Sequence, residues 1–177
     1  MNKLTREKIE EAVRQLPILE YYFIKASEIP FTKEVQKICE MECPRYGKSW
    51  SCPPAVGSME SCQAHCNEFD HAFVFSTTSW TDDSLDMDAC MKARVEHDKV
   101  VSAIWRLTDV NHAFMISSES CSICEKCSYP DKTCRHKDLM HPCIESQGII
   151  VASLAEQLGM TYYIDEHQIV WFGILFF

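Results

Sequence analysis

The segment Cys121-Ser-Ile-Cys124-Glu-Lys-Cys127-Ser-Tyr-Pro-Asp-Lys-Thr-Cys134 places three cysteines at three-residue intervals and a fourth after a proline-containing turn. Thiolates this close together repel one another unless a cation neutralises them, so the spacing predicts a metal site. Zinc usually takes its ligands as two separated pairs. Three evenly spaced thiolates followed by a more distant one are instead typical of a loop around an iron–sulfur cluster, although the gap before Cys134 is longer than in a ferredoxin loop.

A fifth cysteine, Cys143, follows in the segment Met140-His-Pro-Cys143-Ile-Glu-Ser. The apolar periodicity that follows predicts a helix over 143–158, closed by Gly159. A thiol at the start of a helix has its thiolate favoured by the helix dipole. Cys143 is therefore predicted to be either an extra ligand or a reactive thiol.

A second set of cysteines lies upstream, in the loop 39–54. Cys39 and Cys43 are four residues apart on a predicted helix capped by Thr32, so they share one face. Cys52 follows in a turn-rich segment and is stiffened by two prolines behind it. Three thiolates leave one coordination position open or take a fourth ligand from elsewhere, and the candidates are Cys143 and Cys62.

Composition limits the classes of function. The chain has 177 residues, eleven of them cysteine, and a formal net charge of −9. The odd cysteine count and the charged N-terminal segment favour a reducing cytoplasm over a disulfide-bonded secreted protein. The negative charge argues against a nucleic-acid partner. The apolar run 169–177 is too short to span a bilayer and is predicted to be a buried strand.

The hydrophobic pattern predicts an α+β fold. Helices are expected at 5–16, 32–42, 58–69, 82–108 and 143–158, and strands at 19–26, 71–77, 112–117, 161–164 and 168–176. No repeat or linker interrupts the chain, which predicts a single domain over 1–177. We expect a sandwich with helices on one face of a mixed or antiparallel sheet, and both cysteine loops, 39–54 and 121–143, at one end.

The pattern Cys39-x3-Cys43-Pro-x-Tyr46-Gly47-x2-Trp50-x-Cys52-Pro-Pro, joined to the later C-x2-C-x2-C, resembles a prokaryotic family of predicted metal-binding proteins. The family is classed as a domain of unknown function and is common in anaerobes. The resemblance extends over nearly the whole chain, including the Glu145-x2-Gly148 step. It implies binding of metal, of the iron–sulfur kind, and supplies no reaction. One departure concerns the ligand set, because Cys143 stands where the family pattern is expected to have a small serine.

Three functions follow from these observations. In the first, Cys121, Cys124, Cys127 and Cys134 hold one 4Fe–4S cluster, Cys39, Cys43 and Cys52 hold a second with Cys143 or Cys62, and the protein relays electrons to a redox partner protein or enzyme. In the second, an iron with an open position makes the protein an enzyme. In the third, zinc stabilises an interaction module without a redox role. The sequence has no phosphate-binding loop or nucleophile elbow that would name a reaction.

Overall fold

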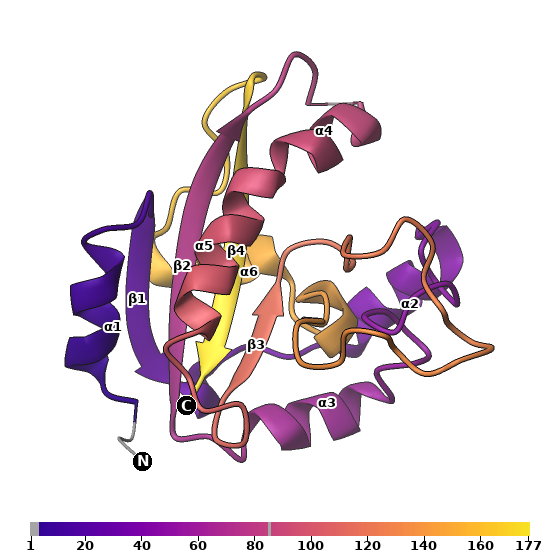
Figure 1. Cartoon of the computed structure of the whole chain (residues 1–177), viewed down its shortest axis with the longest axis horizontal. Coiled ribbons are helices and arrows are strands. Elements are labelled where there is room, and N and C mark those ends of the chain that lie inside the picture. Colours follow the sequence, from indigo (N-terminus) through magenta and orange to yellow (C-terminus); the bar gives the residue numbers. More distant parts are fainter. Residues whose placement is uncertain (1–3, 85) are drawn as a thin grey trace.

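A four-stranded antiparallel sheet forms the centre of the computed structural model, which describes residues 4–84 and 86–177 (Figure 1). The strand order is β1-β2-β4-β3, and every neighbouring pair is antiparallel. The prediction of a mixed or antiparallel sheet is thus met by the antiparallel alternative. The strands are β1 (Glu20–Lys25), β2 (His71–Trp80), β3 (Phe114–Ser117) and β4 (Gln168–Phe176).

Six α-helices in the described residues accompany the sheet, which confirms the α+β class. Three of them begin at side chains that accept a hydrogen bond from the first helical turn: Thr32 from the N–H of Glu34, Ser58 from that of Ser61, and Asp86 from those of Asp88 and Ala89. None of the helices in this part of the chain is both long and apolar enough to cross a membrane. The helices are α1 (Arg6–Val13), α2 (Lys33–Glu42), α3 (Met59–Cys66), α4 (Met87–Ala93), α5 (Val95–Trp105) and α6 (Val151–Leu158), with 3-10 turns at Ala26–Glu28 and Glu145–Gln147.

Both faces of the sheet are covered, so the expectation of helices on one face is wrong. Phe73 and Phe75 of β2 pack with α1 and α5, whereas their neighbours Ala72 and Val74 pack with α6 on the opposite side (Figure 1). The physical reason lies in β2, whose residues are buried on both faces, without alternation, from Ala72 to Thr77. A strand that buries successive residues needs partners on both faces.

Two predicted elements differ from the structure. The segment 161–164 is not a strand, because β4 already pairs with β2 on one side and with β3 on the other. It is held instead by Thr161, whose N–H donates to Glu20 at 2.6 Å. The helix predicted over 82–108, a range in which residue 85 lies outside the described residues, is two helices. The first begins after Asp86, whose carboxylate caps it, and Arg94 separates α4 from α5.

Gly173 of β4 leaves room for the aromatic ring of Phe75 on the neighbouring strand β2. It pairs with Phe75 across β2 and β4, and a Cβ at this position would lie 2.3 Å from the Phe75 ring. Phe75 is fully buried and stacks on His97 of α5. The glycine is therefore required by packing in the middle of a strand.

Replacement of Gly173 by alanine should destabilise the protein by about 1 to 3 kcal/mol, because the methyl group overlaps a ring that cannot move away. Without the clash, the same change in a strand would stabilise it by about 0.5 to 1 kcal/mol. Chemical unfolding of Gly173→Ala, Phe75→Leu and the double variant measures the coupling. Equal cost of Gly173→Ala in both backgrounds would contradict the packing explanation.

His97 joins α5 to two strands inside the core. Its ring is 0 % exposed, with Nδ1 2.8 Å from the hydroxyl of Thr77 on β2 and Nε2 3.0 Å from that of Ser117 on β3. Burial, together with the nearby charge of Arg94, lowers the pKa of His97 from 6.5 to about 3. The imidazole is therefore neutral in the folded protein at every pH above that value.

The buried imidazole predicts a loss of stability in mild acid. The unfolded chain takes up a proton at this position below pH 6.5, whereas the folded protein does so only near pH 3. Stability is therefore full above pH 6.5 and falls as pH decreases, by about 1.4 kcal/mol per unit and thus about 2 kcal/mol by pH 5.

Unfolding by denaturant at pH 7.5 and pH 5 measures this loss. The variant His97→Gln should lose about 2 kcal/mol less than the wild type between the two pH values. The matched control is His167→Gln, since His167 is exposed. An unchanged pH dependence in His97→Gln would contradict the assignment.

Candidate metal centre

Four cysteines from three separate segments gather beside the edge of the sheet, and we call them the first thiol set: Cys39, Cys43, Cys52 and Cys143. Cys39 lies in the last turns of α2, and Cys43 ends that helix with its N–H on the carbonyl of Cys39. Cys143 is joined to the loop of Cys52 by a hydrogen bond from its N–H to the carbonyl of Ser51, 3.1 Å long. The charges of Cys43 and Cys52 act on Cys39, and that of Cys52 on Cys143.

Helix α2 is fixed over this site by contacts with the turn Glu145–Gln147. The amide of Gln36 donates to the carbonyl of Ser146 at 3.0 Å, and the N–H of Thr32 donates to the carbonyl of Gly148 at 2.7 Å. Gly148 has φ +88°, and a Cβ there would lie 2.5 Å from the side chain of Met59. The glycine thus permits α2, α3 and the turn to meet, which brings Cys39 close enough to Glu145 for its carboxylate to act on the thiol.

The first thiol set is poorly solvated and lies near the carboxylate of Glu145. Burial and the neighbouring charge of Cys43 raise the pKa of Cys39 to about 11. Burial and the carboxylate of Glu145 raise the pKa of Cys143 well above its ordinary value, and burial raises that of Glu145 as well. Burial thus favours the protonated form of Cys39 and Cys143, and a metal ion that bound them would have to displace those protons.

Cys143 does not stand at the start of a long helix, contrary to the prediction. A 3-10 turn follows it, and Gly148 separates that turn from α6. The thiol donates to Glu145 Oε2 at 2.8 Å, so its surroundings favour the protonated form and not the thiolate. The expected activation by a helix dipole is wrong, because the glycine breaks the helix after one turn.

The second thiol set comprises Cys121, Cys124, Cys127 and Cys134. All four line one hollow, together with Ser49 and Trp50 of the other cysteine loop. Burial would raise the pKa of Cys127, but hydrogen bonds from the Tyr129 and Trp50 backbones and from the Ser49 hydroxyl lower it overall. The contacts that favour the thiolate of Cys127 thus come from both cysteine loops. The pKa of Cys127 in the second loop therefore depends on Ser49 and Trp50 of the first.

Ser51 connects the two thiol sets. Its hydroxyl accepts a hydrogen bond from the N–H of Cys121 at 2.9 Å, and its carbonyl accepts from Cys143. The same hydroxyl lies 3.6 Å from the sulfur of Cys52. Trp50 adds a second link, because its indole N–H donates to the carbonyl of Lys132 at 3.0 Å. The two cysteine loops are thus in direct contact, on the same side of the sheet (Figure 1).

Sequence reasoning missed three residues of this region. Ser51 is an inconspicuous serine in the sequence, and only its position next to a cysteine marks it. Glu119 lies in the turn after β3 with φ 63°, and its charge raises the pKa of Cys39 and Cys52. Arg94 is 5 % exposed and its charge opposes the rise in the pKa of Cys121 that burial causes.

The remaining cysteines lie apart from these sets. Cys62 is buried on α3, and its thiol donates to the carbonyl of Val56 at 3.5 Å. All eleven cysteines are free thiols. Across residues 4–84 and 86–177, no three side chains of His, Cys, Asp or Glu are close enough together to hold a single metal ion.

Comparison with known proteins gives one match. The model of a family described as predicted metal-binding protein (DUF2284) matches residues 22–177. A search of curated proteins and a search of solved structures found no match. The matched range includes both thiol sets and all four strands except the first two residues of β1. The chain therefore belongs to this family of predicted metal-binding proteins.

Proposed function

We propose that this protein binds two 4Fe–4S clusters, one on each thiol set, and relays electrons to a redox partner in the cytoplasm. The observation that carries the proposal is the position of Ser51 between the two sets, with its hydroxyl on Cys121 and its carbonyl on Cys143. Two redox groups joined through a single residue suit electron transfer from one to the other. When bound, such clusters take up and release single electrons.

The thiol arrangement supports a cluster in the second set. Its four cysteines surround a shared hollow, and each thiolate of a cluster binds a different iron. Hydrogen bonds to the sulfurs adjust the redox potential of such a group. The N–H of His136 lies 3.4 Å from the sulfur of Cys134 and would supply one of them.

Cys143 is the better candidate for the fourth ligand of the first set. It is bonded to the loop that carries Cys52, and the charge of Cys52 acts on it. Cys62 instead uses its thiol on the carbonyl of Val56, and of the first thiol set none contributes to the rise in its pKa. With Cys143, each of the two sets supplies four thiols.

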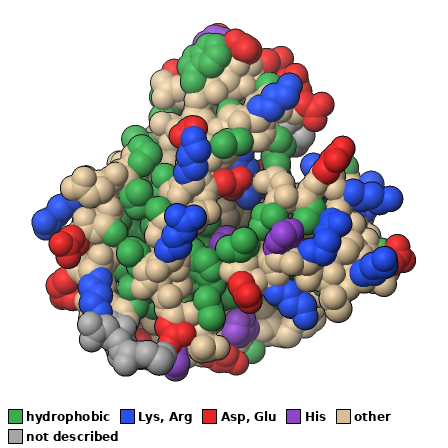
Figure 2. Space-filling view, viewed as in Figure 1, with side chains coloured by type: hydrophobic (Ala, Val, Ile, Leu, Met, Phe, Trp, Pro, Cys, Tyr) green, Lys and Arg blue, Asp and Glu red, His purple; other side chains and the backbone are tan. Residues whose placement is uncertain are grey.

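The second cysteine loop offers a surface for the partner. Lys126, Lys132, Arg135 and Lys137 are all exposed on it, and blue side chains gather on this lobe in Figure 2. They contrast with the net charge of −9 of the whole chain. An acidic surface on the partner enzyme or protein would be complementary and would increase the rate of encounter.

Protein purified without oxygen should be brown and should contain about eight irons and eight acid-labile sulfides per chain, since each cluster has four of each. Dithionite should bleach the colour and produce an EPR signal. A sample that contains zinc, with no sulfide after reconstitution with iron and sulfide, would contradict the proposal and favour a zinc-stabilised interaction module.

Ligand assignment is tested by two alanine variants. Cys143→Ala should reduce iron and sulfide to about half of the wild-type content, because one of the two clusters loses a thiolate. The matched control is Cys62→Ala, which removes a buried thiol outside both sets and should leave the content unchanged. The reverse pattern would make Cys62 the fourth ligand.

A further inference from the structure

A hollow lies between helix α5 and the cysteine loop. Its volume is about 390 Å³, which falls within the range of small-molecule sites. Val101 and Trp105 of α5 and Leu139 of the loop give it apolar walls, and Cys121 reaches it from the second thiol set. Figure 2 shows the face of the molecule hollowed next to the lobe of basic side chains.

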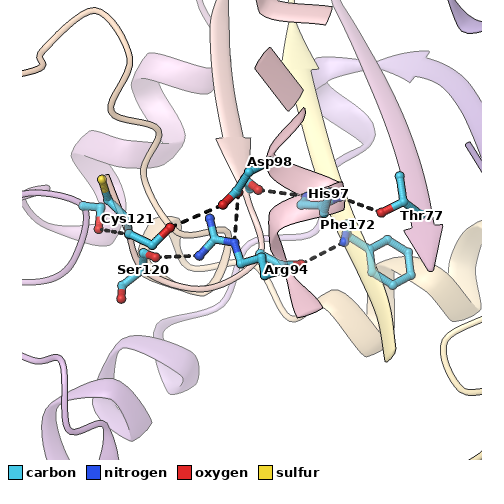
Figure 3. A network of polar contacts seen from close by, with 11 residues as sticks. Thr77, Arg94, His97, Asp98, Ser120, Cys121 and Phe172 are labelled. Atoms are coloured by element: carbon cyan, nitrogen blue, oxygen red, sulfur yellow. Dashed lines mark hydrogen bonds and ion pairs between the residues drawn. The ribbon is translucent and has the colours of Figure 1, made fainter. Parts of the chain in front are cut away.

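Arg94 places a buried cation in this hollow. The side chain enters from the junction of α4 and α5, and Nη1 donates to the carbonyl of Ser120 at 2.6 Å (Figure 3). Nε lies 3.1 Å from an oxygen of Asp98 but forms no hydrogen bond. Arg94, which is 5 % exposed, thus keeps one buried donor, Nε, without a hydrogen bond, which is costly without a ligand.

The surrounding charges select the kind of anion. Asp98 already balances part of the charge of Arg94, and the carboxylate of Glu145 also acts on this region. A dianion such as phosphate would be repelled by these carboxylates, whereas a single negative charge matches the charge of the guanidinium that Asp98 leaves partly unbalanced. The apolar walls favour a ligand whose remaining atoms are hydrophobic.

We propose that the hollow binds a small monocarboxylate with an apolar body, held by Arg94 next to Cys121. The carboxylate accepts hydrogen bonds from the guanidinium of Arg94, and the body lies against Trp105 and Leu139. The placement of this ligand beside a redox group rests on the proposed function, since Cys121 belongs to the second thiol set. Binding to Arg94 itself depends only on the hollow.

Benzoate is a suitable probe, and benzamide is its neutral counterpart. Calorimetry on the protein purified without oxygen should give saturable binding of benzoate and none of benzamide or inorganic phosphate. Arg94→Gln should weaken benzoate at least about 30-fold, as expected for loss of one partner of a buried charge pair. Arg106→Gln is the matched control, since Arg106 lines the same hollow but is exposed, and it should change affinity less than about threefold.

A second variant keeps the test decisive if Arg94→Gln does not fold. Leu139→Trp fills the hollow from an exposed loop position and should abolish benzoate binding. Absence of saturable benzoate binding in the wild type overturns the proposal, as does wild-type affinity in folded Leu139→Trp. Tighter binding of phosphate than of benzoate overturns the choice of a monocarboxylate.

Iron and sulfide content of the same samples separates this proposal from the proposed function. A chain without iron that binds benzoate through Arg94 supports the hollow and overturns the redox role. A chain with full iron content and no benzoate binding supports the redox role and overturns the binding of a carboxylate in the hollow. In the iron-loaded protein, benzoate should shift the EPR signal of the wild type and not that of Arg94→Gln, and binding without a shift would overturn its position next to Cys121.

Discussion

The hydrogen bonds of Ser51 hold together the functional end of the molecule. They fasten the loop 39–54 to the loop 121–143, about seventy residues further along the chain, at Cys121 where that loop begins and at Cys143 where it ends. Both loops are otherwise irregular chain, which has few contacts of its own to fix its position. Together with the bond from Trp50 to Lys132, they fix the position of one thiol set relative to the other.

The sheet gives this junction a rigid base. Strand β3 ends at Ser117, and its chain continues directly into the turn that carries Arg94's partner Ser120 and then Cys121. His97 attaches α5 to the same strand through Ser117, so the helix and the cysteine loop share one support. The hollow next to Cys121 is therefore bounded on both sides by elements that are anchored in the core.

Much of this could be predicted from the sequence, because the signals are local. The spacing of Cys121, Cys124 and Cys127 predicts a metal site without knowledge of the fold, in agreement with a family of predicted metal-binding proteins, and the helix cap at Thr32 is a one-residue signal. Other features depend on distant partners. The role of Ser51 is visible only once the fold brings Cys121 and Cys143 into hydrogen-bonding distance of it. Gly148 ends the turn after Cys143 at a point where Met59 of α3 leaves no room for a side chain.

The position of the last strand has a consequence for biosynthesis. β4 occupies the interior of the sheet, between β2 and β3, although it comprises residues 168–176. While the ribosome still holds those residues in its exit tunnel, the earlier strands have an unfilled place between them. The sheet of the nascent chain therefore stays incomplete, with the thiols accessible to oxidants and to competing metals, until β4 has left the exit tunnel.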